Sequence, residues 1–364
     1  MTVPLPSPPA AQDEPPQLRA EDPPDGASEE DRRRRRERTR WLLRVTLSVA
    51  WILLTAAGLA AIVAGWSDLR TPGWLPQAGA VVITSTYTWG LAARTGGRAY
   101  LSGGLALVAT GGTVVVQAPV LIAGAAVTTA VVAAVLGVMS TKPAARFVGV
   151  VRECLVATVV TAVGAVAVAA YRPEVSLERA GYLTLGLSLL AAVGLVYRLG
   201  AGFHGLGRRG AVMVVGGLAL LFVILAYTEA LSRWGSPGLV TGVEGAVSDV
   251  RSAIGAVPRP AEVLVGFPAL AWGVSTRARR RQGWWVCAFG AAGTASVAVS
   301  LLDPTLPLAE AGLSLLYSAV LGLALGYLVI RVDTFLTGPR GRRARRLEEA
   351  SAHRPEPGRM QPLL

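Results

Sequence analysis

Residues 32–65 read RRRRRERTRWLLRVTLSVAWILLTAAGLAAIVAG, a block of arginines followed at once by an apolar run. A helical run of about 20 apolar residues matches the thickness of the hydrocarbon core of a bilayer. A basic block directly before such a run binds anionic headgroups and holds that end of the chain in the cytoplasm. The stretch therefore predicts a transmembrane helix that enters the membrane from the cytoplasmic side.

The composition of the whole chain agrees with this prediction. Hydrophobic residues make up 52% and charged residues 16%, against roughly a quarter charged in an average soluble domain. The net charge of +12 comes from basic residues in the tails and in short gaps between apolar runs. A nucleic-acid-binding protein needs these charges on one folded face. We therefore expect an all-α integral membrane protein in contact with lipid, with no nucleic-acid partner.

Ten apolar runs define the expected architecture. They cover residues 42–65, 74–93, 101–116, 120–140, 147–170, 180–197, 211–231, 261–276, 284–302 and 311–330. The third and fourth runs are divided at Pro119, which favours a turn. Ten crossings from a cytoplasmic N terminus place 29 of the 35 basic residues on the cytoplasmic side, as the positive-inside rule requires. The prediction is a ten-helix transmembrane bundle over residues 41–331, N-in/C-in, in the plasma membrane.

The segments outside the runs carry three further predictions. Residues 1–40, acidic and then arginine-rich, are expected to form a disordered cytoplasmic tail. The basic residues from Arg32 to Arg40, and those of a second cytoplasmic tail over residues 332–364, are expected to contact anionic lipids. Valines spaced three and four apart predict an amphipathic outer helix near 237–257. This helix could be a structural lid or surface helix, or a gate or partner-docking element.

Small residues at a spacing of four mark two of the runs. Lipid gives helices no hydrophobic reason to associate, so small residues allow the close backbone approach that holds them together. The ninth and tenth runs are therefore expected to face each other as an antiparallel pair. The two stripes are Ala288, Ala292, Ser296 and Ser300, and Ser314, Ser318, Gly322 and Gly326.

Ionisable residues at membrane depth are costly, which makes them candidates for a binding site. Two acidic residues are expected at this depth, Glu153 and, near the outer end of the seventh run, Glu229. Arg152 and Glu153 diverge by about 100° on a helix, so we expect them not to pair, with Arg152 extending to the headgroups. Glu153 is expected to face a polar stretch of the second run in a small substrate pocket. The alternative is ordinary interhelical hydrogen bonding with an interfacial ion pair. The polar stretch includes Thr84, Tyr87 and Thr88.

The predicted function is that of a permease for a small molecule or a lipid. Ten runs divide into five and five, which would make an inverted repeat, although the halves share no residue-level similarity. The third and eighth runs are short, contain glycine and occupy corresponding positions in the two halves. Spans of this kind would form the binding site of such a repeat. One alternative is a non-catalytic membrane scaffold or assembly partner, which would bind another membrane protein. The other is an enzyme acting on a lipid-linked substrate. Enzyme and metal-site motifs are absent from the sequence, so no catalytic residue, metal or cofactor is expected.

Overall fold

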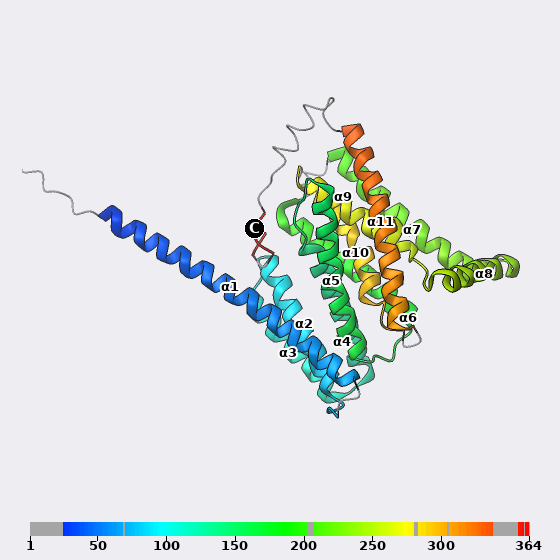
Figure 1. The fold of residues 1–364 in the computed structure, drawn as a ribbon, viewed down its shortest axis with the longest axis horizontal. Coiled ribbons are helices and arrows are strands. Elements are labelled where there is room, and N and C mark those ends of the chain that lie inside the picture. Colours follow the sequence, from blue (N-terminus) through cyan, green and yellow to red (C-terminus); the bar gives the residue numbers. More distant parts are fainter. Residues whose placement is uncertain are drawn as a thin grey trace, which may run out of the picture. The chain divides into compact units, whose positions relative to one another are not determined.

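The computed structural model describes residues 25–67, 70–201, 207–279, 283–303, 306–337, 356–359 and 361–363. The protein is all-helical, with 83% helix and no strand among these residues (Figure 1). The helices are α1 (Asp25–Trp66), α2 (Leu75–Arg94), α3 (Ala99–Val116), α4 (Pro119–Met139), α5 (Phe147–Ala170), α6 (Leu177–Val196), η1 (Tyr197–Ala201), α7 (Gly207–Trp234), α8 (Pro237–Ile254), η3 (Glu262–Gly266), α9 (Phe267–Arg277), α10 (Gly283–Ala298) and α11 (Leu308–Thr337).

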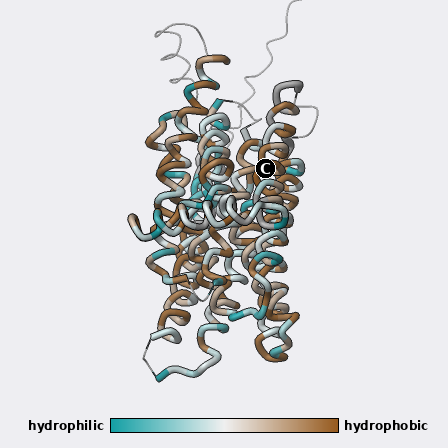
Figure 2. The backbone as a smooth tube through the Cα atoms, turned by 90° about the vertical axis from the view of Figure 1, so that its right-hand side faces the viewer, coloured by the Kyte–Doolittle hydropathy of each residue, from teal (hydrophilic) through white to brown (hydrophobic). Residues whose placement is uncertain are grey.

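Every predicted apolar run coincides with a helix, but not every helix is long and apolar enough to cross a membrane. Apolar residues extend along the long helices (Figure 2). The η3–α9 pair and α10 are short, which leaves the count of ten spans and the five-plus-five repeat unconfirmed. Apolar helices nevertheless indicate a membrane-associated protein. Within the described residues, six helical stretches are long and apolar enough to cross a membrane: Asp31–Trp66, Ala99–Val116, Pro119–Met139, Phe147–Ala170, Leu177–Leu199 and Leu308–Leu336.

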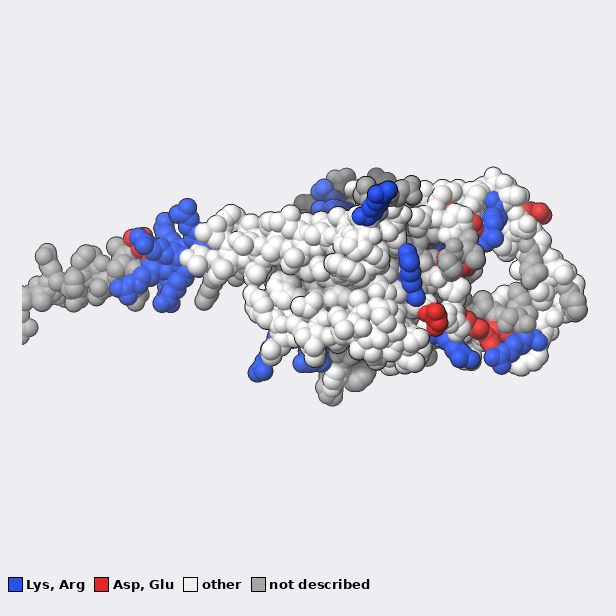
Figure 3. All heavy atoms as spheres, turned by 90° about the horizontal axis from the view of Figure 1, so that it is seen from below, with Lys and Arg blue, Asp and Glu red and all other residues white. Residues whose placement is uncertain are grey.

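The chain divides into two units, Met1–Ser48 and Val49–Leu364. In the first unit α1 begins at Asp25, so the tail predicted to be disordered over residues 1–40 is helical from Asp25 onward. Acidic residues suit the positively polarised N terminus of a helix, and arginine and glutamate are good helix formers. The arginines of this stretch gather together in Figure 3. Residues 1–24 lie outside the described residues.

Small side chains build the core of the second unit. Residues of α4 such as Ala130, Ala133 and Ala134 are fully buried, and nearly all of α10 is buried as well. Pro119 occupies the first turn of α4, as expected at a helix start. Gln117, with φ 54, ends α3 in the left-handed conformation. The predicted division between the third and fourth runs is therefore correct.

The small-residue stripe of α11 packs against η3 and α9. A Cβ added at Gly322 would lie 2.6 Å from the Cβ of Phe267, and one at Gly326 would lie 2.9 Å from the Cβ of Ala271. The prediction that this stripe faces α10 is therefore wrong. The eighth run also carries small residues: a Cβ added at its Gly266 would lie 2.3 Å from the Cα of Gly293 in α10. The spacing of small residues alone did not show whether the α11 stripe packs against the eighth run or against α10.

The serines of the α11 stripe bond the chain just before η3. Ser314 donates to the backbone oxygen of Val257 at 2.6 Å, and the backbone N–H of Arg259 donates to Ser318 at 2.8 Å. The two serine contacts fix the start of η3 against α11. On α10, Ala292 is buried in an apolar cluster with residues of α7 and η3.

The outer helix predicted near 237–257 is present as α8. Its end is held to α11 by an Arg251–Glu310 ion pair of 2.8 Å and by the Tyr317 hydroxyl, which donates to the backbone oxygen of Ile254 at 2.9 Å. Several of its valines, including Val243 and Val247, are exposed. An apolar stripe of this kind is what a membrane–water boundary stabilises.

Candidate functional site

A charged cluster forms where α2, α4 and α9 end. The last carbonyls of a helix have no partner inside the helix and attract cations. The Nε of Arg94 donates to the backbone oxygen of Met139 at 3.0 Å. Arg277 donates to the side-chain oxygen of Thr141 at 2.8 Å and to its backbone oxygen at 3.1 Å. The end of α4 therefore holds two arginines that are far apart in sequence.

Residues 356–359 and 361–363, here called the C-terminal segment, close over these arginines. The Glu356 carboxylate lies 2.6 Å from Arg277 and 3.6 Å from Arg94. The Arg94 side chain also donates to the backbone oxygen of Gly358 at 2.8 Å. The backbone N–H of Leu363 donates to the backbone oxygen of Arg94 at 3.0 Å. The segment thus contacts the cluster through one carboxylate and through its backbone.

Burial makes the two arginines unusual. Their side chains are 0% and 1% exposed, for Arg94 and Arg277 respectively, and Trp284 stacks on the Arg277 guanidinium at 3.5 Å. Loss of water lowers the pKa of Arg94, one residue beyond the second apolar run, to about 10, although Glu356 opposes the shift. Two buried nitrogens, Nη2 of Arg94 and Nε of Arg277, have no hydrogen-bond partner among the residues that the structure describes.

Glu153 lies beside this cluster and is fully buried. It accepts hydrogen bonds from the backbone N–H of Lys142 at 2.8 Å, from Arg359 at 2.6 and 2.9 Å, and from Arg152 at 2.9 and 3.0 Å. The expectation that adjacent Arg152 and Glu153 do not pair is wrong, because the long arginine side chain folds back across the helix surface. Arg152 is itself 67% exposed.

The structure does not bring Glu153 together with the polar stretch of α2. Thr84 bonds the hydroxyls of Thr129 at 2.7 Å and Tyr171 at 3.0 Å. The Tyr87 hydroxyl donates to the backbone oxygen of Val160 at 2.8 Å, and Val160 lies about 10 Å along α5 from Glu153 at 1.5 Å per residue. Thr88 donates to the backbone oxygen of Thr84 in its own helix. These hydrogen bonds therefore do not join Glu153 to the polar stretch of α2.

Glu229, the other predicted acidic residue, lies in a surface hollow between α6 and α7. It pairs with Arg233 one helical turn away and accepts a hydrogen bond from the Tyr182 hydroxyl at 3.3 Å. The side chain is 30% exposed. These contacts are typical of an ion pair at an interface.

A third acidic residue, Glu262, was overlooked in the sequence analysis. It opens the π-helical turn η3 and is fully buried. Its Oε1 accepts hydrogen bonds from Arg259 at 3.1 Å and from Ser296 at 2.8 Å, whereas Oε2 has no hydrogen-bond partner among the described residues. An acidic residue inside the run 261–276, three residues after an arginine, was the signal that could have identified it.

The depth of Glu262 follows from its neighbours. Arg259, which pairs with it, donates through its backbone to Ser318. Ser318 lies ten residues into α11, about 15 Å from the start of that helix at 1.5 Å per residue. Glu262 is thus placed well within the length of the bundle helices.

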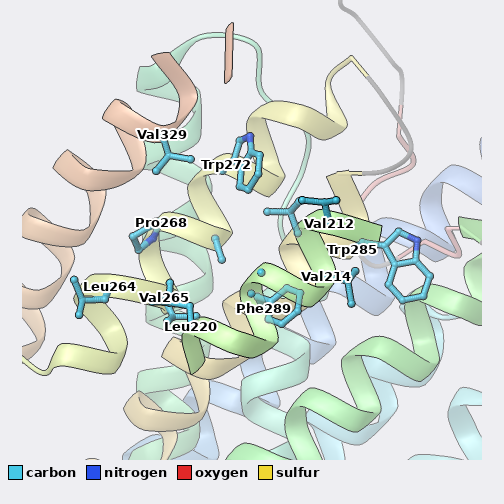
Figure 4. A pocket seen from close by; sticks show the side chains of 14 residues that line it. Val212, Val214, Leu220, Leu264, Val265, Pro268, Trp272, Trp285, Phe289 and Val329 are labelled. Atoms are coloured by element: carbon cyan, nitrogen blue, oxygen red, sulfur yellow. The ribbon is translucent and has the colours of Figure 1, made fainter. Parts of the chain in front are cut away.

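An apolar pocket of about 350 Å³ adjoins η3 (Figure 4). Residues of α7, η3, α9, α10 and α11 line it, among them Leu220, Val265, Pro268 and Phe289. Its lining contains no charged residue in the described part of the chain. On the helix, Leu264 and Pro268 point roughly opposite to Glu262, so the pocket and the carboxylate use different faces of the same segment.

Among the described residues, no group of three or more histidine, cysteine or acidic residues could hold a metal ion. Cys154 and Cys287 are buried and free. No family model, curated protein or solved structure matches the chain.

Proposed function

We propose that the protein is a plasma-membrane permease for a small molecule or a lipid, with ten spans and both termini in the cytoplasm. The observation that carries the proposal is Glu262, a buried carboxylate on an irregular helix, one oxygen of which has no hydrogen-bond partner in the described part of the chain. Transporter sites commonly lie at the middle of the membrane where a helix is interrupted. Single π-helical turns are also frequent at functional sites.

The surroundings of Glu262 suit a polar substrate group or a proton. Its second oxygen can accept a hydrogen bond from an ammonium or hydroxyl group, or take up a proton. The apolar pocket lies on the other face of η3, so a hydrocarbon group bound there would occupy a separate site. Buried ionisable residues inside a membrane bundle are usually kept for such a role, since they cost stability.

The proposed topology has one supporting contact pattern. Arg94, Thr141 and Arg277 meet in one cluster, so an even number of crossings should separate each from the next. Helices α3 and α4 supply two crossings, and α5, α6, α7 and the η3–α9 pair supply four. The inverted repeat gains no such support, because α3 is uninterrupted whereas its counterpart, the η3–α9 pair, contains a π-helical turn.

Uptake by intact cells tests the proposal. Cells that produce the protein, its Glu262→Gln variant or neither are incubated in a defined mixture of metabolites and lipids, and contents are compared by mass spectrometry. We expect at least one compound to change with the wild-type protein and to change at least tenfold less with Glu262→Gln, which cannot ionise.

The matched control is Glu310→Gln, which removes a carboxylate of the same helix bundle that pairs with Arg251. This variant should retain wild-type uptake. Identical contents in cells with and without the wild-type protein, at comparable membrane levels, would contradict a permease function.

A membrane scaffold is the second candidate, favoured by one observation. Glu153 and Thr84 are hydrogen-bonded to protein partners, as expected when polar groups serve packing. Helix α3 also leaves Gly104 and Gly112 with open space around them. A cysteine at Gly112 should then cross-link in native membranes to a second polypeptide at a defined mass, and a cysteine at Gly103, packed on Trp89, should not.

A further inference from the structure

Arg94 and Arg277 present their guanidinium groups to one point. Oε2 of Glu356 contacts Nη2 of both residues, at 2.6 Å for Arg277 and 3.6 Å for Arg94. The contacts that orient them come from elsewhere: Met139 holds Arg94, while Thr141 and Trp284 hold Arg277. Helices α2, α4, α9 and α10 therefore position the two cations independently of the C-terminal segment.

A single carboxylate satisfies this pair incompletely. Within the described residues, Nη2 of Arg94 and Nε of Arg277 are buried donors that make no hydrogen bond, although buried donors are nearly always bonded in native proteins. Phosphate carries more acceptor oxygens than a carboxylate, in a tetrahedral arrangement. Guanidinium groups bind it through paired, charge-assisted hydrogen bonds.

The wider charge balance favours an anion with more than one charge. Near this point three arginines, Arg94, Arg277 and Arg359, face two glutamates, Glu153 and Glu356. The formal excess is two positive charges once Glu356 has left the pair. Such an excess in a mostly buried site raises the local concentration of anions.

We propose that the Arg94–Arg277 pair is a binding site for a phosphate group, for which Glu356 competes as an intramolecular ligand. The phosphate could belong to a free anion in the cytoplasm or to a lipid headgroup of the inner leaflet. The site is separate from Glu262, which lies fifteen residues before Arg277, about 22 Å along the η3–α9 segment.

Binding to the full-length protein tests the site directly. Thermal unfolding is measured in phosphatidylcholine nanodiscs over a range of inorganic phosphate concentrations, with chloride at matched ionic strength as the reference. A ligand that binds only the folded protein raises the unfolding temperature according to its Kd. We expect Glu356→Gln to lower the Kd for phosphate about tenfold, because it removes the competing charge, and Glu310→Gln to leave it unchanged.

Two further arms identify the source and guard against non-specific effects. The first arm adds phosphatidic acid to the phosphatidylcholine nanodiscs. If the ligand is a lipid headgroup, this lipid should stabilise Glu356→Gln and abolish its response to added phosphate. If the ligand is a free anion, added phosphate should stabilise Glu356→Gln equally with and without phosphatidic acid. Arg277→Lys keeps the charge without the paired contact and should weaken binding at least tenfold. An equal response to phosphate and chloride in Glu356→Gln in both discs, or undiminished binding by Arg277→Lys, would overturn the proposal.

Discussion

At the residue scale, Glu153 joins three parts of the chain through its carboxylate. The backbone of Lys142, the neighbouring Arg152 and Arg359 of the C-terminal segment all donate to it. Removing one member of a buried ion pair typically costs about 3–5 kcal/mol. Because Arg152 and Arg359 are partly exposed, we expect Glu153→Gln to lower the free energy of unfolding by about 2 kcal/mol.

The measurement is a double-mutant cycle of Glu153→Gln and Arg359→Gln, followed by thermal unfolding in detergent. The second substitution should cost less once the first is present, with a coupling of about 1–2 kcal/mol. Glu229→Gln, which alters a more exposed ion pair, should cost under about 1 kcal/mol. Additive effects of the two cluster substitutions would mean that the C-terminal segment does not bind Glu153.

Sequence reasoning identified Glu153 as a special residue but not its partners. Periodicity places a side chain on one helix face, whereas Arg359 lies 206 residues away and no local pattern links the two. Arg94 and Arg277 were treated as topology signals, because a basic residue at the end of an apolar run usually is one. Their burial depends on how three helix ends meet, which is a property of tertiary packing.

At the element scale, the contact of α11 with η3 and α9 can be tested by adding one methyl group. A Cβ at Gly322 would lie 2.6 Å from the Cβ of Phe267, so the two segments must move apart. Overpacking of this kind costs about 1–3 kcal/mol, more than the roughly 1 kcal/mol that alanine gains over glycine in a helix. We expect Gly322→Ala to lower the unfolding temperature and the folded yield in detergent.

Gly312→Ala provides the matched control within the same helix. A Cβ there would meet nothing within 4 Å, so only the helix-propensity gain remains and stability should be unchanged or higher. If Gly322→Ala were as stable as Gly312→Ala, the close contact would be absent. The pair also shows what the sequence could tell: the spacing predicted a packing stripe, and only the fold identified its partner.

At the scale of the whole molecule, hydropathy was a better guide to helix positions than to crossings. All ten apolar runs became helices because apolar periodicity and proline positions act locally. Within the eighth run η3 ends at Gly266 and α9 begins at Phe267. Gly266 lies close against Gly293 of α10, and no local sequence pattern indicates this contact. The composition of residues 261–276 does not indicate whether this run starts inside the bundle or at its surface.

The sidedness of the membrane yields the last prediction. With the N terminus in the cytoplasm, the α2–α3 connection should lie inside and α8 outside. Arg98 and Ser252 are both exposed, whereas the native Cys154 and Cys287 are buried and should not react. Single variants Arg98→Cys and Ser252→Cys are therefore treated, in intact cells, with a maleimide that cannot cross the membrane. Ser252→Cys should be labelled at once and Arg98→Cys only after permeabilisation. The reverse pattern would invert the bundle, and labelling of both in intact cells would mean that the segments between them make an even number of crossings.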